Sequence, residues 1–438
     1  MRNQVALVFA SGALAMVLAP RSIAQPASWE SLVEQAEKTR VRTRLSETRD
    51  LLLAARLEAG ELRDDDPRRA RLSFALGTVY QDLGETLKAA PLLEDARRIW
   101  EQLGVEDARY LMSLNYLASG MIERQRLAEA QQLLDRALQT GLRVLGEKHQ
   151  VIAAILNILG GLYLDQGNAP KAEQSLTTAV AILRSLNSPP ETLGTSLRGL
   201  AHVHWLRGDA ATARRLFAES EVVTRALGED SLTYGLAAAG LGNFLVIDGD
   251  PARAQPLLNK ALHIHQSLLG PNHRDLVPIL EGLSALASSE GKKTLARQHL
   301  ERARDIVNKV YGSASSHHAR VEEATGWLLF NDGKLAQAQA LIQHSNETLR
   351  RLYGETHYTV ASSFLTLALV LERQNRRDEA DVAFQRSITG FEATLGENHV
   401  LVARAMKHYA TFLKRSDRVK AHTLEHRAET ILSGKRSR

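Results

Sequence analysis

The chain has 438 residues, of which 44% are hydrophobic and 24% are charged, and its formal net charge is +5. It contains no cysteine, which excludes disulfides, a thiol nucleophile and a lipid-anchor cysteine. The charge is too small to require a nucleic acid or an anionic membrane as a partner, so neither is predicted. Ala, Leu, Arg and Glu recur throughout and aromatic residues make up only 5%, a composition that favours helices.

The start of the chain has the three parts of a secretory signal peptide. Arg2 precedes an uncharged, largely apolar run over residues 5–19, and residues 22–24 have the small-x-small pattern of a cleavage site. The run is too short to span a bilayer comfortably. The sequence therefore predicts a signal peptide over residues 1–24, cleavage after Ala24, and an exported bacterial protein, periplasmic or secreted, with no stable membrane insertion afterwards. The alternative is a frayed apolar leader on a cytosolic protein.

Residues 25–66 form a separate segment, in which one helix over about Trp29 to Leu62 is predicted to cap the repeats that follow. No linker rich in Pro, Gly or Ser interrupts the chain from there to Leu432. We therefore expect one continuous solenoid over residues 67–432 and a frayed tail over residues 433–438.

The solenoid is predicted from three markers that recur in phase. A Leu-Gly or Tyr-Gly pair returns every 42 residues, with one gap of 82 residues that a degenerate copy divides. These glycines are Gly104, Gly146, Gly228, Gly270, Gly312, Gly354 and Gly396. A turn residue follows each junction by about 21 residues, and an alanine lies five residues beyond that turn. A fixed period of this length is the signature of stacked repeats.

Each unit is predicted to be a pair of antiparallel helices. Residues 151–166 place Ile and Leu at helical spacing, Gly167 ends that helix, and a second apolar helix follows over residues 170–186. Gly160 and Ala172 are the small residues that let the two helices approach closely. One pair cannot bury its own apolar face, so neighbouring pairs must stack. The fold class is therefore all-α, with about nine helix pairs that start near Pro67, Ala108, Gln150, Glu191, Ser231, Arg274, Ser316, Tyr358 and Val400.

The positions of Gly160, Tyr163 and Ala172 resemble the tetratricopeptide repeat (TPR). The 42-residue period, together with junctions such as Leu-Gly-Glu-Lys-His at 145–149 and Tyr-Gly-Glu-Thr-His at 353–357, resembles the kinesin light chain-like subtype. The resemblance implies a right-handed α-solenoid, or TPR superhelix, whose first helices line a concave groove. It also implies that the groove binds a peptide or an extended protein segment.

Mapped onto this sequence, the resemblance gives thirteen candidate groove residues. They are Asn115, Asn157, Arg198, His202, Trp205, Asn243, Arg320, Glu323, Trp327, Arg404, Lys407, Lys414 and Arg415. Asn115 and Asn157 match the asparagine with which the subtype holds a peptide backbone, and an amide can both donate and accept. The alternative for both is a solvated groove residue without a ligand.

Two further groups of candidates have a functional and a structural interpretation. The four cations Arg404, Lys407, Lys414 and Arg415 lie on one face of the last pair, where an acidic peptide or a C-terminal carboxylate would find charge-assisted hydrogen bonds. The alternative is a solvated basic cap. Trp205 and Trp327 are predicted either to anchor apolar ligand side chains or to pack between repeats.

No catalytic, cofactor or metal site is predicted. The sequence has no HExxH pair, EF-hand loop, phosphate-binding loop or GxSxG elbow. The histidines at the junctions, His149, His273, His357 and His399, come one per repeat, and we expect them to bond the turn or the next helix start.

We therefore predict a non-enzymatic scaffold whose partner is a protein or peptide, with an acidic peptide as one candidate. The alternative is a structural or assembly subunit of an envelope or secretion complex, acting through self-association or the convex face. The sequence leaves the oligomeric state open.

Overall fold

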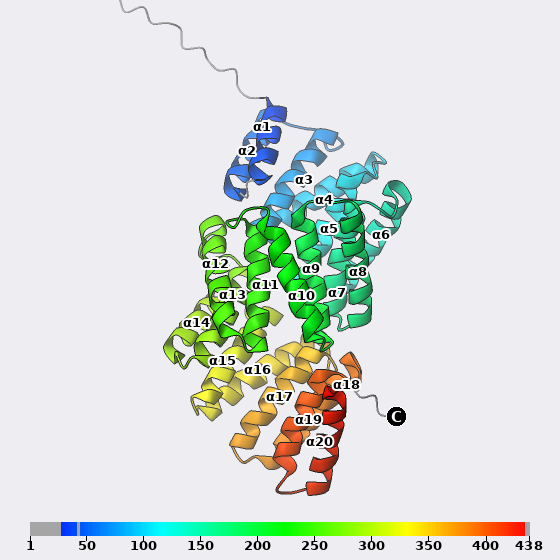
Figure 1. The fold of residues 1–438 in the computed structure, drawn as a ribbon. Coiled ribbons are helices and arrows are strands. Elements are labelled where there is room, and N and C mark those ends of the chain that lie inside the picture. The colour runs from blue at the N-terminus through cyan, green and yellow to red at the C-terminus, as the bar shows by residue number, and fades with distance from the viewer. Residues whose placement is uncertain (1–27, 42–43, 434–438) are drawn as a thin grey trace, which may run out of the picture.

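The structure is a computed structural model and describes residues 28–41 and 44–433. This part of the chain contains 20 helices arranged as antiparallel pairs (Figure 1). The first helices of the pairs are α1 (Trp29–Val41), α3 (Pro67–Asp82), α5 (Ala108–Glu123), α7 (Gln150–Asp165), α9 (Pro190–Leu206), α11 (Leu232–Asp248), α13 (Leu276–Ser289), α15 (Ser316–Asn331), α17 (Tyr358–Arg373) and α19 (Val400–Leu413).

The second helices are α2 (Leu45–Glu58), α4 (Thr86–Gln102), α6 (Leu127–Leu145), α8 (Ala169–Ser185), α10 (Ala210–Arg225), α12 (Pro251–Leu269), α14 (Lys293–Val310), α16 (Leu335–Tyr353), α18 (Arg377–Leu395) and α20 (Arg418–Leu432). The nine predicted pair starts agree with the observed starts to within two residues. The all-α solenoid is thereby confirmed.

The pair α7–α8 shows why these residues form this unit. His149 caps α7 by accepting a hydrogen bond from the Val151 amide, and Gly167 ends the helix in the left-handed conformation at φ +73°. Gly160 faces the second helix, where an added Cβ would lie 2.5 Å from Cγ of Leu176. The absence of a side chain at this position therefore permits the close crossing of the two helices.

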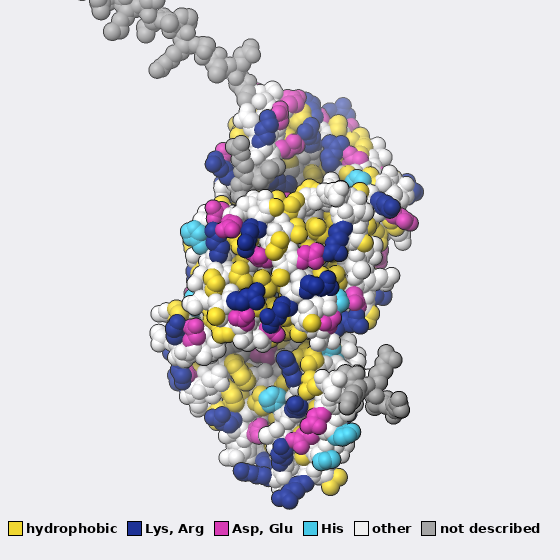
Figure 2. Space-filling model, in the orientation of Figure 1, with side chains coloured by type: hydrophobic (Ala, Val, Ile, Leu, Met, Phe, Trp, Pro, Cys, Tyr) yellow, Lys and Arg dark blue, Asp and Glu magenta, His cyan; other side chains and the backbone are white. Residues whose placement is uncertain are grey.

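Pairs stack so that the first helices form one layer and the second helices another. Packing between first helices of neighbouring pairs continues from α3 to α17. Ion pairs also link consecutive pairs on the outside, as between Arg184 and Glu219 or between Arg297 and Asp332. On the face that Figure 2 shows, basic and acidic side chains are accordingly interspersed.

The segment before the first predicted repeat differs from the prediction. The single helix expected over 29–62 is wrong, because the structure has two helices, α1 and α2, that pack as a tenth pair at one end of the rod (Figure 1). Ala36 and Ala55 are buried, as small residues are in the other pairs. The chain between α1 and α2 carries no Gly or Pro, so the sequence shows no break in the helical pattern.

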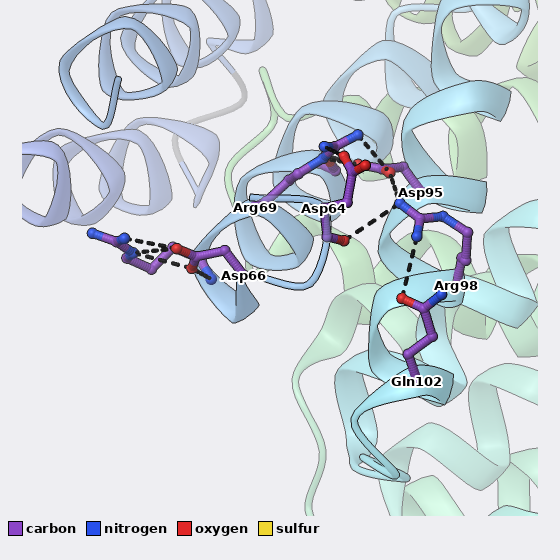
Figure 3. A network of polar contacts seen from close by, with 8 residues as sticks. Asp64, Asp66, Arg69, Asp95, Arg98 and Gln102 are labelled. Atoms are coloured by element: carbon purple, nitrogen blue, oxygen red, sulfur yellow. Dashed lines mark hydrogen bonds and ion pairs between the residues drawn. The ribbon is translucent and has the colours of Figure 1, made fainter. Parts of the chain in front are cut away.

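A polar network fixes the start of the first predicted repeat (Figure 3). Asp66 caps α3 by accepting a hydrogen bond from the Arg68 amide at 2.8 Å. Arg69 of α3 and Arg98 of α4 both bind Asp95, at 2.9 and 2.8 Å. These bonds connect the loop before α3 to both helices of the pair and set where the first repeat begins.

Two predictions fall outside the described residues. The signal peptide predicted over residues 1–24 lies within residues 1–27, which the structure does not describe. Of the frayed tail predicted over residues 433–438, the structure describes only Ser433. Among the helices of the described part, none is both long enough and apolar enough to cross a membrane.

Candidate functional site

A cavity of about 820 Å³ lies at the centre of the superhelix. Its lining comes mainly from seven consecutive first helices, from α5 to α17. Six of the predicted groove residues line it: Asn157, Arg198, His202, Trp205, Asn243 and Arg320. The structure thus brings together candidates that are 163 residues apart in the sequence, because one turn of the superhelix surrounds the cavity.

Arg198 of α9 is the cation of the cavity that has no ion-pair partner. Within the described residues, no carboxylate lies within 4 Å of its guanidinium and no hydrogen-bond acceptor contacts it. Enclosure by the surrounding helices lowers the pKa of Arg198, while the charge of Asp275 raises it. An enclosed charge without a partner is unfavourable, so this position favours an anionic group from a ligand.

His202, one turn further along α9, forms a flat surface with Trp205. The two rings stack with their centroids 5.5 Å apart and an angle of 20° between their planes. Enclosure, together with the nearby charges of Arg320 and Arg198, lowers the pKa of His202 to about 4. The imidazole is therefore neutral at pH 7, and the stacked pair offers an uncharged planar surface beside the Arg198 cation.

Asn243 of α11 lines the cavity and is held in place by α13. Its side-chain nitrogen donates to the Pro278 carbonyl at 3.1 Å, while its Oδ1 has no partner within the described residues. Gly282 is required here, because a Cβ at that position would overlap Asn243 Oδ1. The Oδ1 atom is buried against Gly282, so Asn243 fixes the packing of α11 on α13 at the edge of the cavity.

The opposite wall carries a paired cation and a carboxyl group. Arg320 of α15 donates to Glu281 of α13 at 2.5 Å. Burial raises the pKa of Asp165 to about 6, against the opposing charge of Arg320. Besides its apolar lining, the cavity thus has the unpaired cation of Arg198, the carboxyl group of Asp165, the ion pair of Arg320 with Glu281, and Glu123, which is paired with Arg274.

Sequence reasoning missed several apolar residues of the lining. Phe217 of α10 and Phe244 of α11 lie side by side, with ring centroids 5.3 Å apart. Phe217 belongs to a second helix, which the rule that first helices line the groove omits. Tyr358 reaches the cavity from the start of α17, and burial raises its pKa.

The other seven candidates lie outside the cavity. Asn115 is only 5% exposed and packs within the core of its repeat rather than lining the cavity. Glu323 accepts a hydrogen bond from Thr366 at 3.1 Å, and burial raises the pKa of Glu323 to about 7. Trp327 stacks on Phe330, with 41% of its surface exposed.

The basic group on the last pair is also separate from the cavity. Arg404, Lys407, Lys414 and Arg415 are all exposed, near the end of the rod that is opposite α1 and α2 (Figure 1). Lys414 forms an ion pair with Glu425 of α20 at 2.7 Å. This contact ties one of the four cations to its own helix pair.

A second hollow, of about 620 Å³, lies on the outer layer between α6 and α8. Its floor is formed by apolar residues such as Leu138 and Ile152, and charged residues such as Lys148 lie at its edge. Adjacent second helices of any solenoid leave a cleft of this kind. The central cavity is the stronger candidate because seven helices converge on it with unpaired polar groups.

Comparison with known proteins identifies the repeats. The family model described as the MalT-like TPR region matches residues 60–228, and the model described as the tetratricopeptide repeat matches residues 234–309 and 326–393. None of the curated proteins in the comparison matches the chain.

Several solved structures are similar. A Rap conjugation gene regulator of a plasmid, in complex with a Phr peptide, is 15% identical, with 68% of this chain and 76% of that chain covered and a TM-score of 0.53. A Rap protein complexed with competence and sporulation factor is 13% identical, with 80% and 99% covered and a TM-score of 0.52. A kinesin light chain from Podospora anserina with nearly identical TPR-like repeats is 17% identical, with 46% and 96% covered and a TM-score of 0.37. At these identities the likeness shows the fold alone.

Proposed function

We propose that this chain, which is a tetratricopeptide-repeat protein, binds a peptide or an extended segment of a partner protein in its central cavity and catalyses no reaction. The observation that carries the proposal is Arg198, an enclosed cation without an ion-pair partner in the described part of the chain. A carboxylate of the ligand would offset its charge with charge-assisted hydrogen bonds. The ligand is therefore an acidic segment.

The remaining lining suits an extended chain. Asn157 places an amide group where a peptide backbone can pair with it. The stacked surface of His202 and Trp205, together with Phe244, accommodates apolar side chains. A volume of about 820 Å³ holds a short segment and not a folded domain. The two Rap structures of the same fold, one in complex with a Phr peptide and the other with competence and sporulation factor, support a peptide ligand.

Two finer assignments rest on the sequence. We propose that the chain belongs to the kinesin light chain-like subtype, on its 42-residue period, and that it is exported through residues 1–24. Mass spectrometry of the protein purified from a bacterial envelope fraction tests export. A mature chain that begins at Gln25 supports export, and a chain that retains residues 1–24 contradicts it.

A selection from a phage-displayed library of random peptides tests the proposed function. The wild-type protein should enrich peptides that contain Asp or Glu beside apolar residues. Because hydrogen bonds to charged groups contribute about 1.5–3 kcal/mol, Arg198→Gln should weaken binding of an enriched peptide roughly tenfold or more. Trp205→Ala should also weaken it, because the stacked surface is lost.

The matched control is Arg404→Gln, which removes an exposed cation outside the cavity. It should leave affinity within about twofold, because exposed charges contribute little. Circular dichroism confirms that each variant remains helical. Equal affinity of the wild type and the two cavity variants would contradict binding at this site.

A further inference from the structure

The solenoid touches itself at residues about 190 positions apart. The turns that end α3, α5, α7 and α9 each meet the start of a helix pair five pairs further along the chain. The helices reached in this way are α13, α15, α17 and α19. The offset is constant, so the contacts follow from the pitch of the superhelix and form one continuous line.

At the first of the four contacts Arg274 bonds the turn that ends α3, five pairs away, and also forms an ion pair with Glu123, the last residue of α5, which is 151 residues and four pairs away. Arg274, just before α13, donates to Glu123 at 2.6 Å, to the Gln81 carbonyl at 3.1 Å and to Thr86 Oγ1 at 3.4 Å. Its side chain is 14% exposed and that of Glu123 is 20% exposed. Partial shielding from water strengthens this pair relative to an exposed one.

The next two contacts are hydrogen bonds. Gln125 donates through its side-chain nitrogen to Ser316 Oγ at 3.4 Å. His357 donates through Nε2 to the Asp165 carbonyl at 3.1 Å. The fourth contact is van der Waals, because a Cβ added at Gly208 would lie 3.0 Å from Cβ of Val400.

Three of these four turns contain a glycine, and two of those glycines show how these turns differ from the later ones. A Cβ added at Gly84 or Gly167 would approach His273 or His357, on the other side of the line. At Gly249, Gly291 and Gly333 it would meet nothing within 4 Å. The later turns are free because the described chain ends before a pair five places further along, so the close approach is specific to the first four turns.

These contacts close the wall of the central cavity. Glu123 and Asp165 lie on one side of the line, Arg320 and Tyr358 lie on the other side, and all four line the cavity. We propose that the four contacts of Arg274 with Glu123, Gln125 with Ser316, His357 with Asp165 and Gly208 with Val400 form a latch that closes the cavity laterally, and that its opening admits the bound segment.

The latch is suited to opening because it is narrow. It consists mainly of single side-chain contacts, to which Tyr358 adds packing on the core of the earlier repeats, whereas consecutive repeats share continuous cores. Each repeat of a solenoid packs only on its neighbours, so small changes between repeats add up over five pairs. The latch can therefore part while every helix pair stays folded.

The absence of cysteine allows a direct test without a ligand. Asn157→Cys places one thiol in the cavity, and its rate of reaction with a maleimide carrying a 5 kDa polyethylene glycol reports access for bulky molecules. Adding Arg274→Gln should raise this rate about tenfold, because it removes the charged hydrogen bonds of the latch. The rate with N-ethylmaleimide, which is small, should change far less.

Three controls complete the experiment. Gln132→Cys, on the exposed surface of α6, should react equally fast with and without Arg274→Gln. Arg297→Gln, which breaks an ion pair between adjacent repeats, should not change the rate at Asn157→Cys. Glu123→Gln removes the charge of the other partner in the ion pair and should raise the labelling rate as Arg274→Gln does. It replaces Arg274→Gln in the experiment if that variant loses helicity.

An unchanged rate of polyethylene glycol labelling in folded Arg274→Gln and Glu123→Gln proteins would overturn the latch. Because no peptide is used, this result would leave the proposed function standing. Conversely, a failure to enrich peptides in the library selection would not affect the labelling result.

Discussion

At the scale of single residues, the ring of His357 accepts one hydrogen bond and donates another, which only a neutral imidazole can do. Its Nδ1 accepts a hydrogen bond from the Thr359 amide and so caps α17, while its Nε2 donates to Asp165 of a distant repeat. The same cap, through Nδ1, is present at His149 and His399, whereas Nδ1 of His273 accepts from the Asp275 amide in the turn before α13. The expectation that the junction histidines bond the turn or the next helix start is therefore confirmed.

This arrangement gives the protein a pH dependence that one substitution should remove. Burial lowers the pKa of His357 to about 4, below the ordinary 6.5. Between these values the unfolded state binds more protons, so the contribution of His357 to stability is complete above about pH 6.5 and is lost as pH falls toward 4.

The substitution His357→Asn tests this pH dependence. Asparagine can cap a helix but does not titrate, and it is too short to replace the hydrogen bond from His357 to the Asp165 carbonyl. The variant should be about 1 kcal/mol less stable than the wild type at pH 7.5, and this difference should disappear near pH 6 and be reversed at about pH 4.5, because only the wild type loses stability as the histidine titrates. Urea unfolding at these pH values measures this. A constant difference would contradict the neutral cap.

At the scale of the helix pair, adjacent glycines of α7 have opposite roles. An added Cβ would press on Leu176 at Gly160 but would meet nothing within 4 Å at Gly161. Gly160→Ala should therefore destabilise the protein by about 1–3 kcal/mol through overpacking. Gly161→Ala should stabilise it by about 0.5–1 kcal/mol, since alanine favours the helix. Thermal unfolding of both variants measures these changes in stability. Equal changes for Gly160→Ala and Gly161→Ala would contradict the close helix crossing at Gly160.

The period of the sequence was sufficient to predict the helix pairs, because each pair repeats the same local signals. In the pair α7–α8, for example, Gly167 ends the first helix and Gly160 permits the helices to cross closely, and both signals are local to the pair. The pair α1–α2 was not predicted as two helices, because its connection lacks a glycine or proline that would mark the turn. Without such a residue the helical pattern of the sequence continues through the break between α1 and α2.

The candidate site was predictable where it depends on helix periodicity. Asn157, Arg198 and His202 are on the inner face of first helices, and the structure places all three in the cavity. Phe217 and Tyr358 were missed because their positions depend on how far each repeat rotates relative to the last. That rotation is the sum of many packing contacts, and no local motif encodes it.

At the scale of the whole molecule, the same accumulated rotation makes the solenoid complete one superhelical turn and contact itself. After five pairs the solenoid meets itself, and the concave groove becomes a central cavity whose lining groups are exposed to a shared interior. The basic group of Arg404 and Lys407 lies outside this cavity, so the structure separates it from the six candidates in the lining. A partner segment held by the cavity therefore contacts α9 and not α19.

Site-specific photo-crosslinking tests most directly whether the partner segment binds in the central cavity. A benzoylphenylalanine at position 205, in place of Trp205, and another at position 404, in place of Arg404, are each irradiated with a peptide enriched by the wild-type protein. We expect a covalent adduct from position 205 and none from position 404, with unlabelled peptide suppressing the adduct. An adduct only from position 404, or none from position 205 while the peptide remains bound, would contradict the account that the central cavity is the binding site.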